Sequence, residues 1–159
     1  MKANTLLEWR DFYGRMFKME VDFSHLSVFE RSPFKGRMIV IPKGITLDNL
    51  FFVCKRHLSC TVLGKNLDTL RSVHRACADY IVWLDEDGFI DFRRGVRYMP
   101  LTFEERLILE LKHYGEEGNF YDRKYTNLCL GSRFPDGDLP SVFVDNTRGE
   151  LCVGMPVPL

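Results

Sequence analysis

Ser132, Arg133 and Asp136 are the polar residues of this chain whose types and spacing could do chemistry. A hydroxyl, a guanidinium and a carboxylate in one short segment could serve a hydrolase, provided that a histidine joins them in a pocket that shifts their pKa values. A structural interpretation competes with this one, because Asp136-Gly137 is a turn signal and Arg133 can pair with a local carboxylate. We favour the structural interpretation, and no GxSxG, P-loop or GxGxxG motif occurs in the chain.

Two further groups of carboxylates invite a chemical interpretation. Glu104 and Glu105 could act as general acid and base, but both fall in the first turn of a predicted helix, where the helix dipole favours carboxylates. The acidic segment 85–91 resembles a calcium loop at first sight. Its glycine, however, would put Trp83 and Arg94 at the first and last ligand positions of an EF-hand, and neither side chain can coordinate calcium. A hairpin turn is therefore predicted over 85–88.

The histidines and cysteines do not indicate a metal site. His57 lies near Cys54 and Cys60, but these residues would span a helix end and a strand start, so zinc is not expected. No HxH, HExxH or CxxC spacing occurs among His25, His57, His74 and His113 or among Cys54, Cys60, Cys77, Cys129 and Cys152. Because the cysteine count of 5 is odd, the sequence predicts buried free thiols in a reducing compartment. No cofactor is expected.

The composition is that of a soluble globular protein without a strong charge. Among 159 residues, 22 are basic and 22 are acidic, so the formal net charge is zero. A neutral chain lacks the electrostatic footprint of a general nucleic-acid binder, and neutrality favours self-association. Phosphate contact remains the minority interpretation of a mildly basic region formed by Lys35, Arg37, Lys43, Lys55 and Arg56. Neither a signal peptide nor a membrane span is recognised, so a cytoplasmic protein is predicted.

Periodicity and capping signals predict the elements that position these residues. Helices are expected from the Thr5–Glu8 capping box to about Phe17, after Thr46, over about 67–76, and from the Thr102–Glu105 capping box to Gly115. Strands are expected at 37–41, 60–63, 80–84, 89–92, 127–130, 141–144 and 150–153. The sequence thus predicts an α+β fold, with a small β-α-β N-terminal portion at 1–65 and a second portion at 66–159.

The predicted strands of the C-terminal tail have two unlike faces. Val142, Val144, Leu151 and Val153 would form an aliphatic face that packs on a core, because side chains alternate along a strand. The opposite face would combine a hydroxyl, an aromatic ring, a carboxylate, a thiol and a glycine, at Ser141, Phe143, Asp145, Cys152 and Gly154. This mixture suits a surface whose contacts can vary on a fixed scaffold. An ordinary amphipathic hairpin with a solvated face fits the pattern as well.

Several motifs recur in the same order in a group of uncharacterised proteins from uncultivated small-genome bacteria and archaea. They are Tyr80-Ile81-Val82-Trp83, the helix from Leu101 to Tyr114, Leu128-Cys129-Leu130-Gly131-Ser132-Arg133, Asp136-Gly137 and Leu139-Pro140-Ser141-Val142. The resemblance covers about residues 37–153. That group resembles the target proteins of diversity-generating retroelements, in which a reverse transcriptase rewrites a short C-terminal segment, mainly at adenines. Such targets have a C-type lectin fold and carry the rewritten residues on its ligand-binding surface.

The resemblance implies a C-type lectin-like ligand-binding domain at 66–159, with Tyr80–Leu84 as its first strand and the tail as its central strands. Positions that vary in the relatives correspond to Phe134, Asp138, Ser141, Phe143, Asp145, Asn146, Thr147, Arg148, Cys152 and Gly154. Phe134 and Phe143 would be the aromatic anchors. The relatives continue into a further strand where this chain has the segment Gly154–Leu159.

The expected function is therefore a non-enzymatic binding protein that displays a diversified surface to an unknown protein or other macromolecular ligand. Nothing resembles a calcium-dependent sugar site, so the word lectin describes only the fold. Two alternatives stay open. One is a small hydrolase-like enzyme using Asp136, Arg133 and a histidine, and the other is a nucleic-acid-contacting accessory protein of a mobile element.

Overall fold

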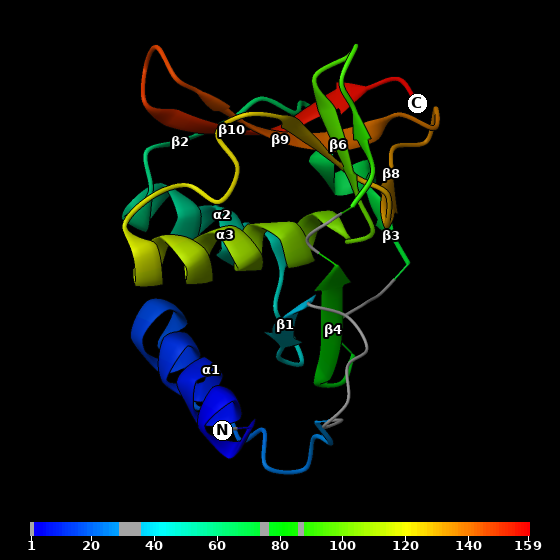
Figure 1. Cartoon of the computed structure of the whole chain (residues 1–159). Coiled ribbons are helices and arrows are strands. Elements are labelled where there is room, and N and C mark those ends of the chain that lie inside the picture. The colour runs from blue at the N-terminus through cyan, green and yellow to red at the C-terminus, as the bar shows by residue number, and fades with distance from the viewer. Residues whose placement is uncertain (1, 29–35, 74–76, 86–87) are drawn as a thin grey trace.

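The computed structural model of the chain describes residues 2–28, 36–73, 77–85 and 88–159 and has an α+β architecture (Figure 1). Its helices are α1 (Lys2–Phe17), α2 (Leu47–His57), the short 3-10 helix η1 (Leu67–Thr69) and α3 (Phe103–Glu117). Its strands are β1 (Gly36–Ile41), β2 (Cys60–Val62), β3 (Arg71–Ser72), β4 (Tyr80–Asp85), β5 (Ile90–Asp91), β6 (Val96–Met99), β7 (Thr126–Cys129), β8 (Ser132–Arg133), β9 (Leu139–Asp145) and β10 (Glu150–Val157).

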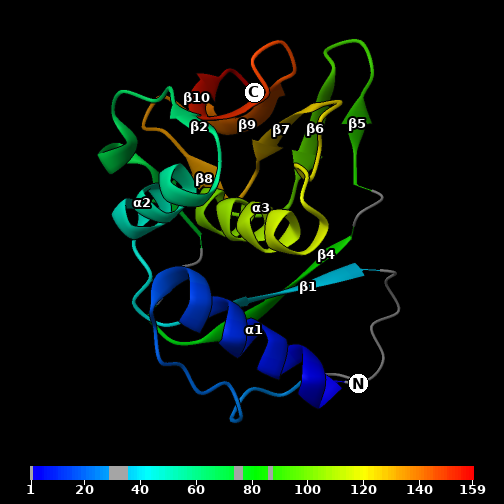
Figure 2. The same cartoon turned by 90° about the vertical axis from the view of Figure 1, so that its left-hand side faces the viewer.

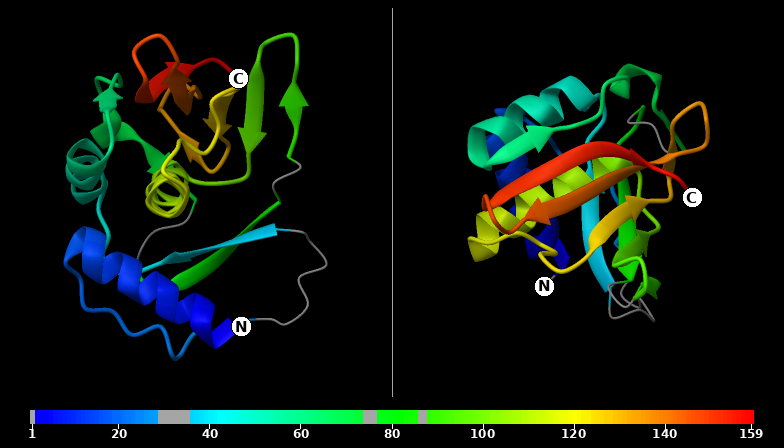
Figure 3. Two further views of the ribbon diagram at one scale, coloured as in Figure 1. Left: turned by 60° about the vertical axis from the view of Figure 1, so that its left-hand side comes forward. Right: turned by 90° about the horizontal axis from the view of Figure 1, so that it is seen from above.

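A mixed six-stranded sheet forms one layer of the molecule, with the strand order β2-β10-β9-β7-β6-β5. The pairs β2–β10 and β6–β7 are parallel, and the other pairs are antiparallel. The register of β10 on β9 shifts between Val153 and Pro156, and beyond this bulge Val157 pairs with Leu139. The segment Pro156–Val157 therefore continues the central hairpin. Seen from above, β10 and β9 run side by side across the helices (Figure 3).

Helix α3 lies between the six-stranded sheet and the two-stranded ribbon β1–β4 (Figure 2). Helix α1 packs against β1, where Tyr13 donates to Val40 O, and reaches α3 through Trp9 and Lys112. Because α3 is covered on opposite sides, it buries a nearly continuous run of residues, including Glu105, Arg106 and Glu110. A surface helix would keep its charged face in water. Here the charged side chains need partners inside the protein, because an unpaired buried charge is costly.

The predicted helix starts are only partly confirmed. The capping boxes differ: Thr102 caps α3 as predicted, with Glu105 N donating to Thr102 Oγ1 over 3.1 Å and Thr102 N donating to Glu105 Oε1 over 2.8 Å. Thr46 also caps α2 as predicted. Thr5, by contrast, lies inside α1, which begins at Lys2. The predicted end of α3 at Gly115 is wrong as well. Gly118, with a φ of 72°, ends the helix instead.

The helix predicted over 67–76 is wrong in its described part. Only Leu67–Thr69 is helical, as a 3-10 turn, and Arg71 and Ser72 form β3. They pair there with Arg133 and Ser132 of β8. Long-range strand pairing thus overrides the local helix pattern. Residues 74–76 lie outside the described part of the chain.

Most predicted strands are confirmed, but the partner of one was misjudged. The segment predicted to fold back on 80–84 is β5, and its partner is β6, which the sequence did not indicate. The strand β4 pairs instead with β1, for example Trp83 with Met38. The turn expected over 85–88 includes residues 86–87, which lie outside the described part of the chain.

The N-terminal portion does not close a β-α-β unit of its own. The order β1-α2-β2 is present, but β1 pairs with β4 while β2 pairs with β10. Trp9, Ile39, Leu50, Leu107 and Val153 belong to one hydrophobic core. The predicted boundary near residue 65 therefore does not divide the protein into two separate hydrophobic cores. Residues on either side of it complete the same sheets and the same interior.

Candidate functional site

The β9–β10 hairpin carries most residues of the predicted variable face, and its aliphatic face is confirmed. Val142, Val144, Leu151 and Val153 are buried in the main core. Leu151 pairs with Val144 within the hairpin and with Cys60 of β2. On the other edge, Asn127 of β7 pairs with Val142. The hairpin is therefore held by strands on both edges and by the core beneath it.

Only part of the opposite face reaches solvent. The exposed residues are Asn146, Thr147 and Arg148, and the partly buried ones are Asp138, Phe143 and Asp145. The prediction that the whole face is open is wrong at the buried positions Phe134, Ser141, Cys152 and Gly154. The predicted set is also spread out. Phe134 lies before β9, whereas the exposed turn follows β9. The 7 extended residues of β9 between Phe134 and the turn span about 20 Å.

Neighbouring segments explain why part of this face is covered. Ser141 Oγ donates to Met155 O over 2.8 Å, so the hydroxyl is used within the hairpin. Gly154 has a φ of 86° and lies against the side chain of Leu67 and the backbone of Gly64. Cys152 lies between Thr61 and Phe143 in the sheet register. Burial is the main cause that raises the pKa of the Cys152 thiol. A ligand would have to displace these segments to reach the covered residues.

Phe134 lies in the wall of a pocket of about 610 Å³. Leu63, Met155 and Pro156 make much of the wall apolar, and Lys65 and Asp136 add one charge of each sign. The Phe134 side chain is only 7% exposed. It therefore forms a wall of the pocket and does not project from the surface as the expected anchor would.

The turn between β9 and β10 is the most exposed part of the predicted site, and its backbone is well ordered by hydrogen bonds. Asp145 Oδ1 accepts from Thr147 N over 3.0 Å and from Arg148 N over 3.2 Å. Gly149 N donates to Asp145 O over 2.8 Å, and the φ of Gly149 is 66°. Asn146 exchanges hydrogen bonds with Arg123, donating to its carbonyl and accepting from its Nε. The turn is thus joined to the loop that follows α3.

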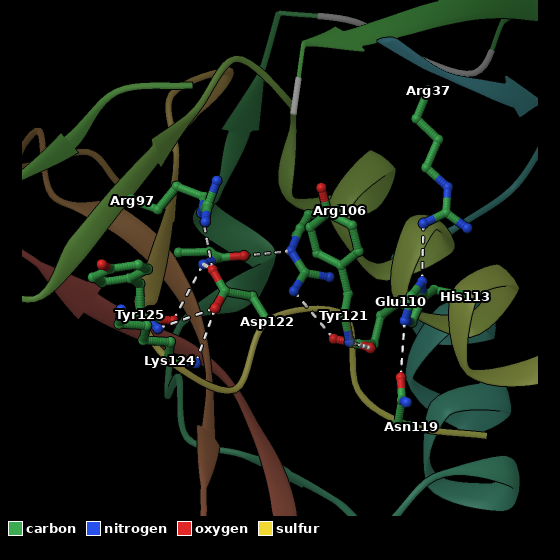
Figure 4. A network of polar contacts seen from close by, with 11 residues as sticks. Arg37, Arg97, Arg106, Glu110, His113, Asn119, Tyr121, Asp122, Lys124 and Tyr125 are labelled. Atoms are coloured by element: carbon green, nitrogen blue, oxygen red, sulfur yellow. Dashed lines mark hydrogen bonds and ion pairs between the residues drawn. The ribbon is translucent and has the colours of Figure 1, made fainter. Parts of the chain in front are cut away.

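A buried polar network fixes that loop (Figure 4). Arg106 Nη2 donates to Glu110 Oε1 over 3.1 Å, and Arg106 Nε donates to Asn127 Oδ1 over 3.0 Å. Glu110 Oε2 accepts from the backbone N–H of Tyr121 over 2.8 Å. Since Arg106 and Glu110 are almost fully buried, this ion pair is shielded from water. Within the described part of the chain, Arg106 Nη1 has no hydrogen-bond partner.

Asp122 extends the network toward the surface. Its carboxylate accepts from Arg97 Nε over 3.0 Å and from Asn127 Nδ2 over 2.8 Å, and also from the backbone N–H groups of Lys124 and Tyr125. Burial acts to raise the pKa of Asp122. The hydrogen bonds and the charge of Arg97 outweigh burial, so the pKa of Asp122 lies below its usual value. The loop that carries Arg123, Lys124 and Tyr125 is therefore held by an ionised, multiply bonded carboxylate.

Replacing Asp122 with asparagine should lower the free energy of unfolding by about 1.5–3 kcal/mol at pH 7. Because the pKa of Asp122 is depressed in the folded state, its stabilisation is present above the unfolded pKa of about 4 and is lost as the pH falls through the folded pKa. Urea unfolding at pH 7 and about pH 2.5 measures the difference, which should shrink at the lower pH. The exposed control Asp11→Asn should change the free energy of unfolding by less than about 0.5 kcal/mol at pH 7. A deficit of Asp122→Asn that is equal at both pH values contradicts this account.

The polar residues considered for catalysis are engaged locally. Ser132 Oγ accepts from Phe103 N over 2.9 Å and bonds to Ser72 Oγ over 2.7 Å, while Ser72 donates to Glu104. Arg133 Nη1 donates to backbone carbonyls, Leu130 O among them, so its predicted pairing with a carboxylate is wrong. The predicted turn at Asp136-Gly137 is confirmed by the φ of 92° at Gly137 and by its N–H bond to Phe134 O.

The described histidines that could have joined this group have other contacts. His113 bonds to Arg37 and Asn119 near the end of α3, and His25 pairs with Asp79. The hydrolase-like arrangement of Asp136, Arg133 and a histidine thus finds no convergent geometry in the described residues.

The five cysteines are free thiols. Cys54, Cys129 and Cys152 are buried as predicted, but the prediction is wrong for Cys77, which is exposed, and Cys60 is only partly buried. Burial raises the pKa of Cys60 to about 12 and that of Cys129 to about 12, so these thiols are protonated at neutral pH and are poor nucleophiles. Among the residues that the structure describes, no group of histidine, cysteine and carboxylate side chains is arranged to hold a metal ion.

One polar pocket was not indicated by the sequence. A hollow of about 310 Å³ between α1, β1 and α3 is lined by Trp9, Trp83, Arg37, Lys112 and Glu116, among others. Lys112 Nζ lies 4.9 Å from the centre of the Trp9 ring and pairs with Glu116. Burial is the main cause that lowers the pKa of Lys112. These residues come from separate segments, so no local motif could have revealed the pocket.

Comparison of the chain with protein-family models, with curated proteins and with solved structures finds no match in any of the three. None of the described helices combines the length and the apolar character needed to cross a bilayer.

Proposed function

We propose that this protein is a non-enzymatic binding protein with a C-type lectin-like scaffold, and that its C-terminal segment is the diversified target of a retroelement. The observation that carries the proposal is the division of the β9–β10 hairpin. Its aliphatic face and both edges are built into the fold, while the turn Asn146–Gly149 faces solvent. A surface of this kind can change its side chains without changing the frame that holds them.

The geometry narrows the contact surface that the resemblance implies. Asn146, Thr147, Arg148 and Phe143 are accessible, and the turn backbone is held mainly by bonds to Asp145. Substitution at 146–148 therefore leaves the backbone bonds of the turn in place. Asp145 is the least replaceable member of the set, because its carboxylate organises the turn. A ligand would thus contact the turn and Phe143 beside it on β9.

The scaffold assignment rests on the order of elements. The strand β4, the helix α3 and the central strands β7, β9 and β10 follow one another as the resemblance implies. The proposal includes no calcium-dependent sugar binding, since no metal-ligand group is found in the described part of the chain.

Reading the DNA that flanks the gene tests the proposal most directly. A near-copy of the codons for Gly131 to Val153, differing mainly at adenines and lying next to a reverse transcriptase gene, is the expected finding. The adenine positions should map to codons of the accessible residues more often than to Leu151 and Val153. Flanks without such a repeat and without a reverse transcriptase would overturn the diversified-binder proposal.

A further inference from the structure

Aromatic and basic side chains gather along one edge of the molecule, where the β5–β6 hairpin meets the loop after α3. We call this surface the aromatic-basic edge, and it consists of Phe92, Arg93, Arg97, Arg123, Lys124 and Tyr125. The Phe92 ring lies 6.2 Å from the Tyr125 ring in an edge-to-face contact. Arg97 and Lys124 lie over the Tyr125 ring, at 5.5 and 5.3 Å from its centre. The two segments thus form a continuous surface.

The edge exposes an unusual amount of aromatic surface. Phe92 is 76% exposed, and Phe89 on the same hairpin is 69% exposed. A phenylalanine in this position gains nothing from burial in the folded chain. Tyr125 beneath it is partly buried and holds it from one side only. One face of the Phe92 ring is therefore available to a flat partner.

The charge along this edge is predominantly positive. Arg93, Arg123 and Lys124 are exposed, and Arg148 of the neighbouring turn, which pairs with Glu150 over 3.7 Å, is exposed as well. The described carboxylates nearby are already engaged. Asp122 is bonded to Arg97, and Asp91 accepts from the backbone N–H groups of Arg93 and Arg94. The neutral composition of the whole chain conceals this local excess, because the cations come from two separate segments.

The edge is also held in place before any partner arrives. The Asp122 network fixes Tyr125 and Lys124, and Asn146 fixes Arg123. Figure 4 shows Arg97, Lys124 and Tyr125 grouped around Asp122, on the side away from Arg106. A preorganised surface loses less conformational entropy on binding than a flexible one.

We propose that the aromatic-basic edge binds single-stranded nucleic acid. An unpaired base would stack on Phe92, which Tyr125 supports from beneath, and the exposed cations would neutralise the phosphates that flank the base. Proteins that bind single strands without sequence preference combine the same two features, a basic track and aromatic stacking platforms. A duplex hides the faces of its bases, so the exposed ring favours a single strand over a double strand. This inference does not depend on diversification of the hairpin turn.

Fluorescence anisotropy tests the proposal with the full chain and labelled oligonucleotides of about 15 nucleotides, dT and rU, a length that covers typical site sizes of about 4–16 nucleotides. Binding of both is expected at low salt. With about three phosphates neutralised, raising the salt from about 50 to 200 mM should weaken binding roughly 20-fold. Phe92→Ala should weaken binding about 10-fold, the value expected for one lost stacking contact. Lys124→Gln should make the salt dependence shallower by about one phosphate contact.

Phe52→Ala is the matched control. Phe52 is 66% exposed on α2 beside Lys55 and Arg56, so it presents an exposed ring near basic residues on another surface. Its replacement should leave binding unchanged. The proposal is overturned if no oligonucleotide binds at low salt, or if Phe52→Ala and Phe92→Ala act equally. It is also overturned if poly-glutamate competes as well as the oligonucleotide and Phe92→Ala has no effect, because the edge would then recognise acidic protein. Thr147 belongs to the proposed variable turn and not to the aromatic-basic edge, so Thr147→Ala should not alter oligonucleotide binding. Because the two surfaces are separate, failure of this inference leaves the proposed function untouched.

Discussion

Replacing Glu110 with alanine is expected to lower the free energy of unfolding by about 3–5 kcal/mol, because it leaves the Arg106 guanidinium buried without its counter-charge. Both side chains are almost completely inaccessible to water. The substitution also removes the acceptor for the backbone N–H of Tyr121, which fixes the start of the loop after α3. Urea unfolding followed by circular dichroism measures the change.

Two further variants separate burial of the charge from loss of the side chain. Glu117→Ala removes an exposed carboxylate from the same helix and should change the free energy of unfolding by less than about 0.5 kcal/mol. The double variant Arg106→Met, Glu110→Leu removes both charges and should be more stable than Glu110→Ala alone, since buried pairs can be replaced by apolar residues at little cost. A loss for Glu110→Ala below about 1 kcal/mol would show that water reaches the pair.

Replacing Leu151 with alanine should lower the free energy of unfolding by about 2–5 kcal/mol, the usual cost of a cavity at a fully buried leucine. Leu151 lies between β2 and β9 and packs in the main core. In contrast, Thr147→Ala on the exposed turn should change stability by less than about 0.5 kcal/mol. Chemical denaturation of both variants measures this division directly.

The contrast between Leu151 and Thr147 is what a rewritable surface requires. Random substitution at codons 146–148 should give mostly folded protein, because the turn backbone is held by Asp145 and Gly149. Random substitution at 151 and 153 should give mostly unfolded protein. Equal loss of folded protein in the two libraries would contradict the separation of frame and surface on which the proposed function depends.

Local elements with strong signals could be predicted from the sequence. The Thr102–Glu105 capping box, the strands at 37–41 and 80–84, and the aliphatic face of the tail are all found in the structure. These features depend on hydrogen bonds and periodicities within a few residues, so the chain carries them wherever it lies. The α+β class follows from them.

What covers each face depends on long-range packing, which local patterns do not encode. Periodicity shows that Ser141 and Cys152 share a face. It does not show that Ser141 bonds across the hairpin to Met155, or that Cys152 lies beside Thr61 of β2. The same reason explains the strand β3, which pairs with β8 where the local pattern predicted a helix.

The charged interior is the clearest case. Arg106 and Glu110 have the spacing of an ordinary pair on a helix surface, and the sequence alone favours that interpretation. Their burial arises because α3 is packed between the six-stranded sheet and the β1–β4 ribbon, which brings residues far apart in the sequence to both sides of the helix. Likewise, the aromatic-basic edge joins a hairpin and a loop. Their local positive charge is not visible in the composition, because the whole chain has zero formal net charge. Spacing determines which residues lie together on an element, whereas long-range packing determines whether they meet water, each other or a partner.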